Sequence, residues 1–476
     1  MVPLLVSALL VTAFLVALRS GAMPLGVRGE WEWLRLPILI GPEPISLALA
    51  TVGVAGYALF AGLGIRALGR RATLGREAFG VSLLAAAAVT VQVLAQNGAP
   101  PGYGLAKWVL ALHQKGSSGY FTVAKTEVGD LRQFLADYPT WIRGQDALHI
   151  GTHPPGLIAA ESAILSAMEQ APALARFVED HAPDSVGLAF RFYGQTNPMS
   201  PADRATLVVT GFLTLLACAL TVVPLYVLAR ASLSASSSWS AAALWPLVPS
   251  AILFQPTADS AFPLLSTTAL AFAAHSVRVG RGRGTALAAA AGLTLAVAIQ
   301  FSLVFLAVGL VVAIVIGTAV DTPIRERVGR TFATGLGFLA VTLTVWATTR
   351  ANPFVIWWWN QRNHARFYDE FPRTFAAWAV ANLVELAVAL GLPVAIYAGL
   401  SLVWVRRVPR VSLATLGVLV FLTLSGRNLS EVARLCTTIG VLAEGELIYN
   451  DSLASTLERF PDEASLEDIY VRLEAR

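Results

Sequence analysis

Charged residues are scarce in this chain. Only 13% of its 476 residues are Asp, Glu, Lys or Arg, whereas 56% are hydrophobic. Because a soluble protein carries roughly a quarter charged residues, this composition excludes an ordinary soluble enzyme. Several apolar runs approach or exceed the roughly 20 residues that cross a bilayer as a helix. Backbone N–H and C=O groups in lipid must form hydrogen bonds with one another because no water is present. The sequence therefore predicts an all-α polytopic membrane protein.

Cysteine, internal repeats and an N-terminal basic segment are also lacking. The two cysteines, Cys218 and Cys436, lie far apart, which excludes a disulfide framework and a cysteine metal motif. The opening run "MVPLLVSALLVTAFLVALRS" has no basic residue before its apolar stretch, unlike a secretory signal peptide. We therefore predict that residues 1–19 form an uncleaved first span, with a cleaved signal peptide as the alternative.

Hydropathy predicts about 11 transmembrane helices. They lie near residues 2–18, 45–65, 79–96, 205–229, 238–254, 260–277, 285–302, 303–319, 331–349, 377–405 and 411–424. The run 285–319 is long enough for two short helices, or for one tilted helix plus a re-entrant piece. The run 377–405 contains Gly391 and Pro393 and is interpreted as one kinked helix.

Four short basic turns predict the sidedness of the chain. They cover residues 66–76, 278–284, 325–330 and 406–410. Basic residues mark cytoplasmic loops in membrane proteins, so the net charge of +4 does not indicate nucleic-acid binding. With these turns in the cytoplasm, the extracytoplasmic segments are 97–203, 255–259, 350–373 and 425–434. The predicted parts are N-terminal transmembrane helices (1–96), a large extracytoplasmic loop (97–203), a transmembrane bundle (204–435) and a short acidic soluble tail (436–476).

The large loop is predicted to contain interfacial helices. Loops of roughly 100 residues usually have structure or function of their own. The stretch "LRQFLADYPTWI" (131–142) has its apolar residues at helical spacing, and "PPGLIAAESAILSAM" (154–168) opens with proline, as helices often do. The second helix is too short to span a bilayer and is expected to lie along the membrane surface.

Glu127 and Asp130 are the candidate catalytic acids of this loop. Transfer of a sugar or phosphoryl group needs a carboxylate that takes a proton from the acceptor, and cations that stabilise a leaving phosphate. The two acids are three residues apart and would share one face of a helix if the segment is helical. The alternative is that both are ordinary solvated carboxylates.

His149 and His153 lie in the stretch "HIGTHPPGLI". Two histidines four residues apart could bind a metal, but no third ligand is identifiable, so metal ligands stay unassigned. A substrate contact or a capping role fits better. The proline pair also allows a simpler interpretation, in which the stretch is only a rigid turn that leads into the interfacial helix.

Asp259 is the third candidate acid. Between Arg230 and Arg278, only Asp259 and His275 have side chains that ionise, and Asp259 follows a polar break between two spans. An acid at membrane depth is costly and marks a functional site by default. The alternative is an exposed turn residue that caps the next helix.

Two further segments contain candidate substrate-binding cations. Arg362 and His364 lie among aromatic residues in "WWWNQRNHARFYDEFPR", and Arg427 and Arg434 lie in "SGRNLSEVARL". A guanidinium group can grip two oxygens of a phosphate. The alternatives are an interfacial anchor for the first segment and local ion pairs with Glu431 for the second.

Over residues 95–435 the chain resembles bacterial GT-C-type glycosyltransferases of the protein mannosyltransferase and aminoarabinose transferase kind. The resemblance rests on "PTAD" (256–259), on the pattern N-x-x-N-H-A-x-F-Y followed by P-R from residue 360, and on G-R-N-x-x-E-x-A-R-L from residue 426. It implies a polyprenyl-phosphate sugar donor, an extracytoplasmic active site and a loop carboxylate as base. On this basis Glu127 or Asp130 would be the base and Asp259 would line the site. The resemblance also places His153 at the inner edge of the loop, and it implies that the lipid phosphate is faced by Arg362, His364, Arg427 and Arg434.

We therefore hypothesise that the chain is a multi-pass glycosyltransferase of the cell (inner or plasma) membrane and that its active site faces the extracytoplasmic side. Its partners would be a polyprenyl-phosphate-linked sugar, the bilayer and an acceptor glycan, lipid or protein. No cofactor is assigned, although a divalent cation would suit the leaving phosphate.

A transporter or lipid flippase is one alternative, but it would need charged or broken helices near the midplane and usually a repeat. A non-catalytic assembly protein that docks through its tail is the other. An outer cavity that gathers the candidate residues would favour the enzyme. A midplane cavity would favour transport, and no convergence would favour assembly.

Overall fold

Helices dominate the computed structural model. It describes residues 2–23, 25–33, 41–69, 73–396, 398, 438–443 and 446–452. Within these ranges the strands form two antiparallel hairpins. One pairs β1 (Gly26–Val27) with β2 (Trp31–Glu32), and the other pairs β3 (Thr438–Ala443) with β4 (Glu446–Ser452). The predicted helical class is therefore confirmed, and β3–β4 lies in the segment predicted as the tail.

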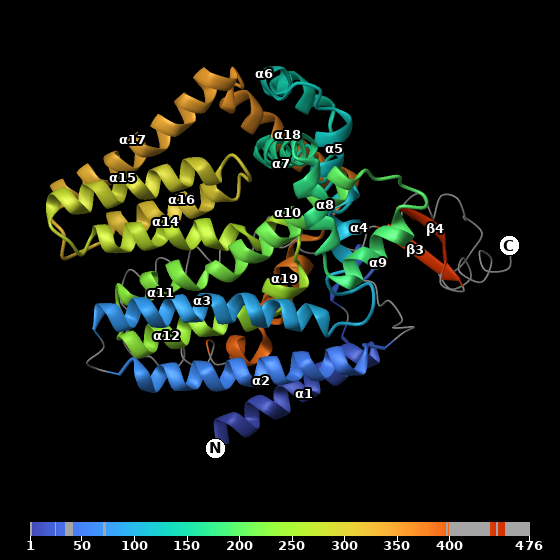
Figure 1. Cartoon of the computed structure of the whole chain (residues 1–476). Helices are drawn as coiled ribbons and strands as arrows, with labels where there is room; N and C mark the ends of the chain where they lie inside the picture. The colour runs from blue at the N-terminus through green and yellow to red at the C-terminus, as the bar shows by residue number, and fades with distance from the viewer. Residues whose placement is uncertain are drawn as a thin grey trace.

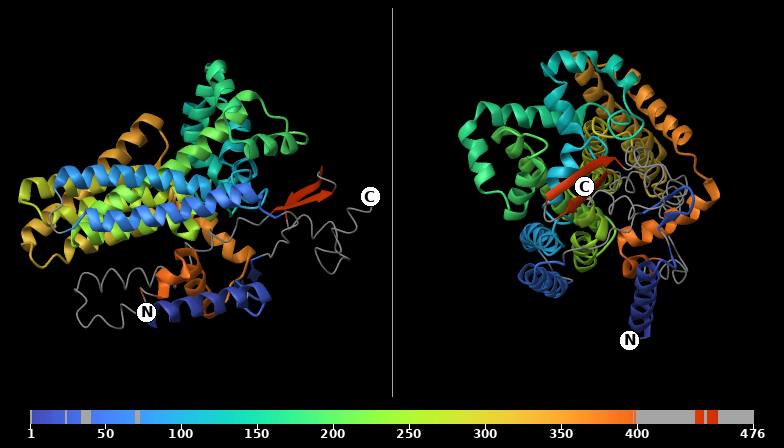
Figure 2. Two further views of the ribbon diagram at one scale, coloured as in Figure 1. Left: turned by 60° about the horizontal axis from the view of Figure 1, so that its bottom comes forward. Right: turned by 90° about the vertical axis from the view of Figure 1, so that its right-hand side faces the viewer.

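The larger part of the described chain is a bundle of elongated helices that lie side by side (Figures 1 and 2). Their bounds are α2 (Pro44–Ala67), α3 (Leu74–Asn97), α10 (Pro201–Leu220), α11 (Val222–Arg230), α12 (Ala235–Leu244), α13 (Pro249–Leu253), α14 (Phe262–Ser276), α15 (Arg281–Ala298), α16 (Phe305–Gly317) and α17 (Ile324–Thr349). Helix α1 (Val2–Ser20) lies apart from them (Figure 2).

Four of the described segments are long and apolar enough to cross a membrane: α2, α3, α10 with α11 and α17. The number rises to five if the bent pair α18 (Pro353–Glu370) and α19 (Phe375–Leu390) is one span. This is fewer than the predicted count of about 11, but the predicted span 411–424 and most of 391–405 lie outside the described residues. The bundle is thus that of a membrane-associated helical protein.

Two predicted breaks are informative. The run 285–319 forms two helices, α15 and α16, as its length allows. The run 377–405 is not one kinked helix, because α19 ends at Leu390 and Gly391 has a φ of 93°. Since this left-handed conformation cannot continue a right-handed helix, the predicted kink is a break.

Small residues let the bundle helices approach one another closely. A Cβ on Gly292 of α15 would lie 1.9 Å from the carbonyl oxygen of Thr334, and one on Gly337 of α17 would lie 2.4 Å from that of Ala289. Close backbone approach through glycine and alanine is typical of helix packing in lipid. Large apolar side chains such as Leu59 and Phe332, 67% and 66% exposed, instead cover the outer face. That face suits contact with lipid.

A compact group of short helices, here called the lobe (residues 98–200), lies at one end of the bundle (Figure 1). Its elements are α4 (Lys107–His113), α5 (Tyr120–Thr126), α6 (Leu131–Trp141), the 3-10 turn η1 (Ile142–Gly144), α7 (Gly156–Gln170), α8 (Pro172–Asp180) and α9 (Asp184–Tyr193). Helices α6 and α7 confirm the two helices predicted in the large loop. The lobe packs on α10, where Gly211 leaves room for the indole of Trp108.

The basic turns lie at the other end of the bundle. Arg230 pairs with Glu77 at 2.9 Å, Arg278 donates to the Ser232 hydroxyl at 3.1 Å, and Arg330 donates to the Val279 carbonyl at 3.3 Å. Glu77 directly follows the predicted turn 66–76, and Arg330 contacts Val279 of the turn 278–284, so three of the four predicted turns lie at one end of the bundle, opposite the lobe (Figure 1). The fourth, 406–410, lies outside the described residues. The side of a membrane that each end faces stays a prediction.

Candidate functional site

The stretch "HIGTHPPGLI" forms a turn between η1 and α7. The Asp146 carboxylate accepts hydrogen bonds from the backbone N–H groups of Leu148, at 2.9 Å, and Gly151, at 3.4 Å. A Cβ at Gly151 would lie 2.0 Å from the Asp146 carbonyl oxygen, so only glycine fits there. The backbone is therefore held by local hydrogen bonds, and His149 and His153 do not share a helix.

Helix α18 clamps this turn with two asparagines. The side-chain amide of Asn360 donates to the carbonyl oxygens of Gly151, at 3.0 Å, and His153, at 2.9 Å. That of Asn363 donates to the carbonyl oxygens of Ile142 and Gly151, both at 3.0 Å. Both asparagines are almost fully buried, so they position the turn and do not contact solvent. The N-x-x-N pattern of the sequence is thus a positioning element.

The two histidines of the turn have different surroundings. His153 is buried, with its Nδ1 2.8 Å from the His149 carbonyl oxygen and its ring edge-on to Tyr120. Its own carbonyl accepts from the Tyr138 hydroxyl at 2.9 Å. This histidine lies inside the turn and holds it together. The His149 ring, by contrast, forms part of a cavity wall.

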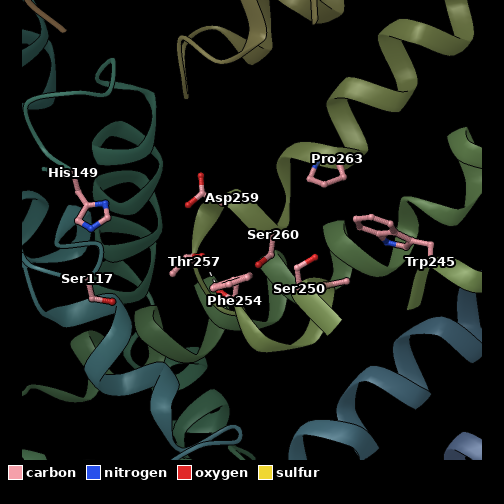
Figure 3. A pocket seen from close by; sticks show the side chains of 10 residues that line it. Ser117, His149, Trp245, Ser250, Phe254, Thr257, Asp259, Ser260 and Pro263 are labelled. Atoms are coloured by element: carbon pink, nitrogen blue, oxygen red, sulfur yellow. Dashed lines mark hydrogen bonds between the residues drawn. The ribbon is translucent and has the colours of Figure 1, made fainter. Parts of the chain in front are cut away.

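The cavity lies where the lobe meets the bundle, is partly open to solvent and has a volume of about 140 Å³. Ser117 and His149 line it from the lobe, and the bundle contributes Trp245, Ser250, Ala251, Phe254, Thr257, Asp259, Ser260 and Pro263. Figure 3 shows the Asp259 carboxylate projecting toward the wall that carries His149 and Ser117. A carboxylate and an imidazole, separated by more than a hundred residues in sequence, therefore face the same space.

Asp259 lies in the 3-10 turn η3 (Ala258–Ser260) between α13 and α14. The N-cap of α14 is Ala261, and no side chain caps that helix. The capping alternative for Asp259 is therefore wrong. Asp259 instead lines the cavity.

Buried amides support the chain just before Asp259. Gln255 accepts from Gln96 at 2.6 Å and donates to Gln92 at 3.1 Å, and Gln96 also accepts from the Trp108 indole at 3.1 Å. All four side chains are almost fully buried. Because a satisfied buried network is rigid, it fixes the turn of Asp259 against α3 of the bundle and α4 of the lobe.

Glu127 and Asp130 lie elsewhere. Glu127 is at the end of α5, where it accepts from Lys115 at 2.9 Å and from the Trp141 indole at 3.0 Å. Asp130 is the N-cap of α6 and accepts from the Gln133 backbone N–H at 2.7 Å. The expectation that they share one helix face is wrong, because a turn separates α5 from α6. Neither residue lines the cavity.

The predicted cations are also not gathered at the cavity. Arg362 is exposed on α18, with its guanidinium carbon 5.7 Å from the centre of the Trp359 ring. His364, on the same helix, lies edge-on to Tyr368. Arg427 and Arg434 lie outside the described residues. Of the predicted site residues that the structure describes, only His149 and Asp259 come together at this cavity.

Lys107 is a cation that the sequence analysis missed. Its ammonium group donates to the Leu253 carbonyl at 2.5 Å, next to Phe254 of the cavity wall. Burial lowers the pKa of Lys107 to about 8. A lone lysine in the otherwise uncharged segment 98–114 was the available sequence signal. Among the described residues, no group of three or more His, Cys, Asp or Glu side chains is arranged to hold a metal ion.

A second cavity, with a volume of about 210 Å³, also borders this turn. Pro154, Pro155 and Gly156 line it from the turn, and Gln300, Val345, Thr349 and Trp357 are among the residues that face them from the bundle and α18. Its walls carry no charged side chain. The "HIGTHPPG" turn therefore contributes His149 to the cavity of Asp259 and Pro154–Gly156 to a cavity with uncharged walls.

Comparisons of the chain with protein-family models, with curated proteins and with solved structures found no match.

Proposed function

We propose that the chain is a membrane glycosyltransferase of the GT-C kind, which moves a sugar from a polyprenyl-phosphate donor to an extracytoplasmic acceptor. The observation that carries the proposal is the cavity between lobe and bundle, in which Asp259 faces His149. It lies at the end of the bundle remote from the basic turns, which is the outer end if those turns are cytoplasmic. The proposal includes about 11 spans, of which 411–424 and most of 391–405 lie outside the described residues.

In the proposed reaction Asp259 is the general base. Its carboxylate takes the proton of an acceptor hydroxyl as the hydroxyl oxygen forms a bond to the anomeric carbon of the sugar. The bond between that carbon and the phosphate oxygen breaks, and the lipid phosphate leaves with the electron pair. His149, on the opposite wall, would hydrogen-bond to the sugar or the acceptor.

The leaving phosphate needs positive charge nearby. Lys107 lies beside the cavity wall, and the resemblance assigns Arg427 and Arg434 to the same task. A divalent cation would add to this charge. The second cavity, with its uncharged walls, suits the isoprenoid chain of the donor, which has no polar groups to satisfy.

The sequence gives little support to the transporter alternative. A transporter usually contains an internal repeat and charged or broken helices near the midplane of the membrane. The sequence shows no internal repeat. A site between a lobe of roughly 100 residues and the bundle fits chemistry on a lipid-linked substrate better.

The test compares three isosteric variants: Asp259→Asn, Glu127→Gln and Asp130→Asn. Membranes that contain equal amounts of folded protein are assayed for transfer of labelled sugar from polyprenyl phosphate. We expect Asp259→Asn to lower transfer on the order of 10²- to 10⁴-fold, because the base is lost. The other two should stay within about threefold of wild type, since asparagine also caps helices well and an exposed ion pair contributes little. Unchanged transfer by Asp259→Asn would exclude the assignment.

A further inference from the structure

Two exposed arginines share one aromatic ring at the junction of η1 and α18. The guanidinium carbons of Arg143 and Arg362 lie 5.5 Å and 5.7 Å from the centre of the Trp359 ring. Both distances are within the range of a cation–π interaction. Arg143 comes from the lobe, whereas Arg362 and Trp359 are on α18. The ring therefore brings together two positive charges from segments more than two hundred residues apart.

Neither arginine has a carboxylate partner within the part of the chain that the structure describes. Arg366, one turn further along α18, does pair with Glu370, at 3.1 Å. Arg143 donates through its Nε to the Pro139 carbonyl at 3.3 Å, which leaves its two terminal nitrogens facing solvent or a ligand. Two exposed arginines that contact one ring and have no carboxylate partner attract anions to this surface.

The surroundings of this pair are those of a membrane interface. Phe354, Trp358 and Arg362 follow each other at intervals of four residues and so form one strip along α18. Phe354 is 52% exposed and Trp358 is 63% exposed. At its start α18 packs on the lobe end of α17, with Phe354 6.1 Å from Trp346 between ring centres. Exposed aromatics beside the end of a candidate span are typical of the headgroup region.

We propose that Arg143 and Arg362, held by Trp359, bind the phosphate group of an anionic phospholipid. The forked donors of two guanidiniums match phosphate oxygens, and the aromatic strip places them at headgroup depth. A bound lipid would join η1 of the lobe to α18 and so stabilise the clamp on the "HIGTHPPG" turn. The site does not depend on the proposed transfer reaction, because neither arginine lines the cavity of Asp259.

The test measures the thermal unfolding midpoint of the purified full-length chain in detergent–phosphatidylcholine mixed micelles as phosphatidylglycerol replaces phosphatidylcholine. The wild type should show a saturable rise. In the double variant Arg143→Gln/Arg362→Gln the half-saturating fraction of phosphatidylglycerol should increase roughly 30-fold, or the rise should vanish. If the unfolding midpoint of this double variant responds to phosphatidylglycerol as that of the wild type does, the proposed lipid site is excluded.

The matched control is Arg132→Gln/Arg191→Gln, which removes two other exposed arginines of the lobe. It should titrate like the wild type, and an equal loss would mean that overall charge, and not this site, attracts the lipid. The double variant Arg143→Lys/Arg362→Lys keeps both positive charges and controls for misfolding of the glutamine variant. It should bind several-fold more weakly because an ammonium lacks the fork, and an unchanged response contradicts the proposal. Inorganic phosphate alone should leave the midpoint unchanged, and a rise with it would overturn the lipid assignment.

Discussion

At the scale of single residues, burial decides how a carboxyl group behaves. Glu161 of α7 is 7% exposed and accepts a hydrogen bond from the Thr210 hydroxyl of α10 at 2.8 Å. Burial raises the pKa of Glu161 to about 7, from an ordinary value of 4.5. The folded protein therefore holds this proton up to about pH 7, whereas the unfolded chain releases it near pH 4.5. The stabilising contribution is complete below pH 4.5 and is lost as the pH rises through 7.

We predict that Glu161→Gln removes this pH dependence. Glutamine keeps the shape and the acceptor but has no charge to bury, so the variant should match wild type near pH 4, below the unfolded pKa, and exceed its stability at pH 8. The gain is at most about 3 kcal/mol. Thermal unfolding of the solubilised protein at a series of pH values checks this prediction. Parallel curves for the two proteins would show that Glu161 does not titrate in this range.

The contacts of single residues also show that the three candidate acids have different roles. Asp130 precedes an apolar periodic run, which is the sequence signal of an N-cap, and the structure uses it as one. Its capping role was therefore predictable. The role of Glu127 was not, because its partners Lys115 and Trp141 lie on different elements of the lobe. Only the folded chain shows that Asp259, and neither of these acids, faces a cavity with a histidine.

At the scale of elements, α18 acts as a clamp on the turn that carries His149. We predict that Asn360→Ala lowers the free energy of unfolding by about 1–2 kcal/mol, because two buried hydrogen bonds are lost while Asn363 and Tyr138 still donate to the same two carbonyl groups. Looser placement of His149 should also lower transfer roughly tenfold or more. Denaturant or thermal unfolding and the transfer assay measure the two effects.

The control for the clamp is Gln361→Ala, an exposed neighbour on the same helix. Its stability should stay within about 0.5 kcal/mol of wild type, as for most surface substitutions. If Asn360→Ala unfolds like Gln361→Ala, the hydrogen bonds of Asn360 to Gly151 and His153 do not stabilise the turn. The clamp would then be unnecessary for the site.

Helix positions were well predicted where apolar periodicity is strong, as for 131–142 and 154–168 in the lobe. The prediction failed at Gly391, where a positive φ ends α19 instead of bending it. The sequence shows where glycine and proline interrupt a helix, but packing decides whether the helix bends or ends at that point. Here α19 packs beside α13, with Pro249 3.3 Å from the position of a Cβ on Gly391.

At the scale of the whole molecule, the proposed function requires that the lobe end of the bundle faces the outside of the cell. We predict that single cysteines at Gly129 of the lobe and Ala365 of α18 react from outside intact cells with a membrane-impermeant maleimide. Cysteines at Gly282 and Gly329, near the basic turns, should react only after permeabilisation. These positions are exposed, and added Cβ atoms at the three glycines meet no neighbour within 4 Å. The native Cys218 is buried, and Cys436 is replaced by serine.

Labelling of positions 129 and 365 from opposite sides would contradict the model of a shared outer face. The lobe and α18 would then lie on different sides of the membrane. This result would exclude both the contact between α18 and the "HIGTHPPG" turn and the proposed enzyme site. Labelling of 282 and 329 from outside would invert the topology and place the cavity of Asp259 in the cytoplasm. Either result is independent of any transfer assay.

The sequence alone determined that the chain forms apolar helices, that basic turns divide them, and that one polar segment of roughly 100 residues stands apart. These features depend on local composition and periodicity, which are readable along the chain. The tertiary structure decided which polar residues meet. His149 and Asp259 share a cavity, Asn360 and Asn363 hold the turn, and Glu127 is occupied by an ion pair. These contacts join elements far apart in sequence, and only the packing of the lobe on the bundle brings them within reach.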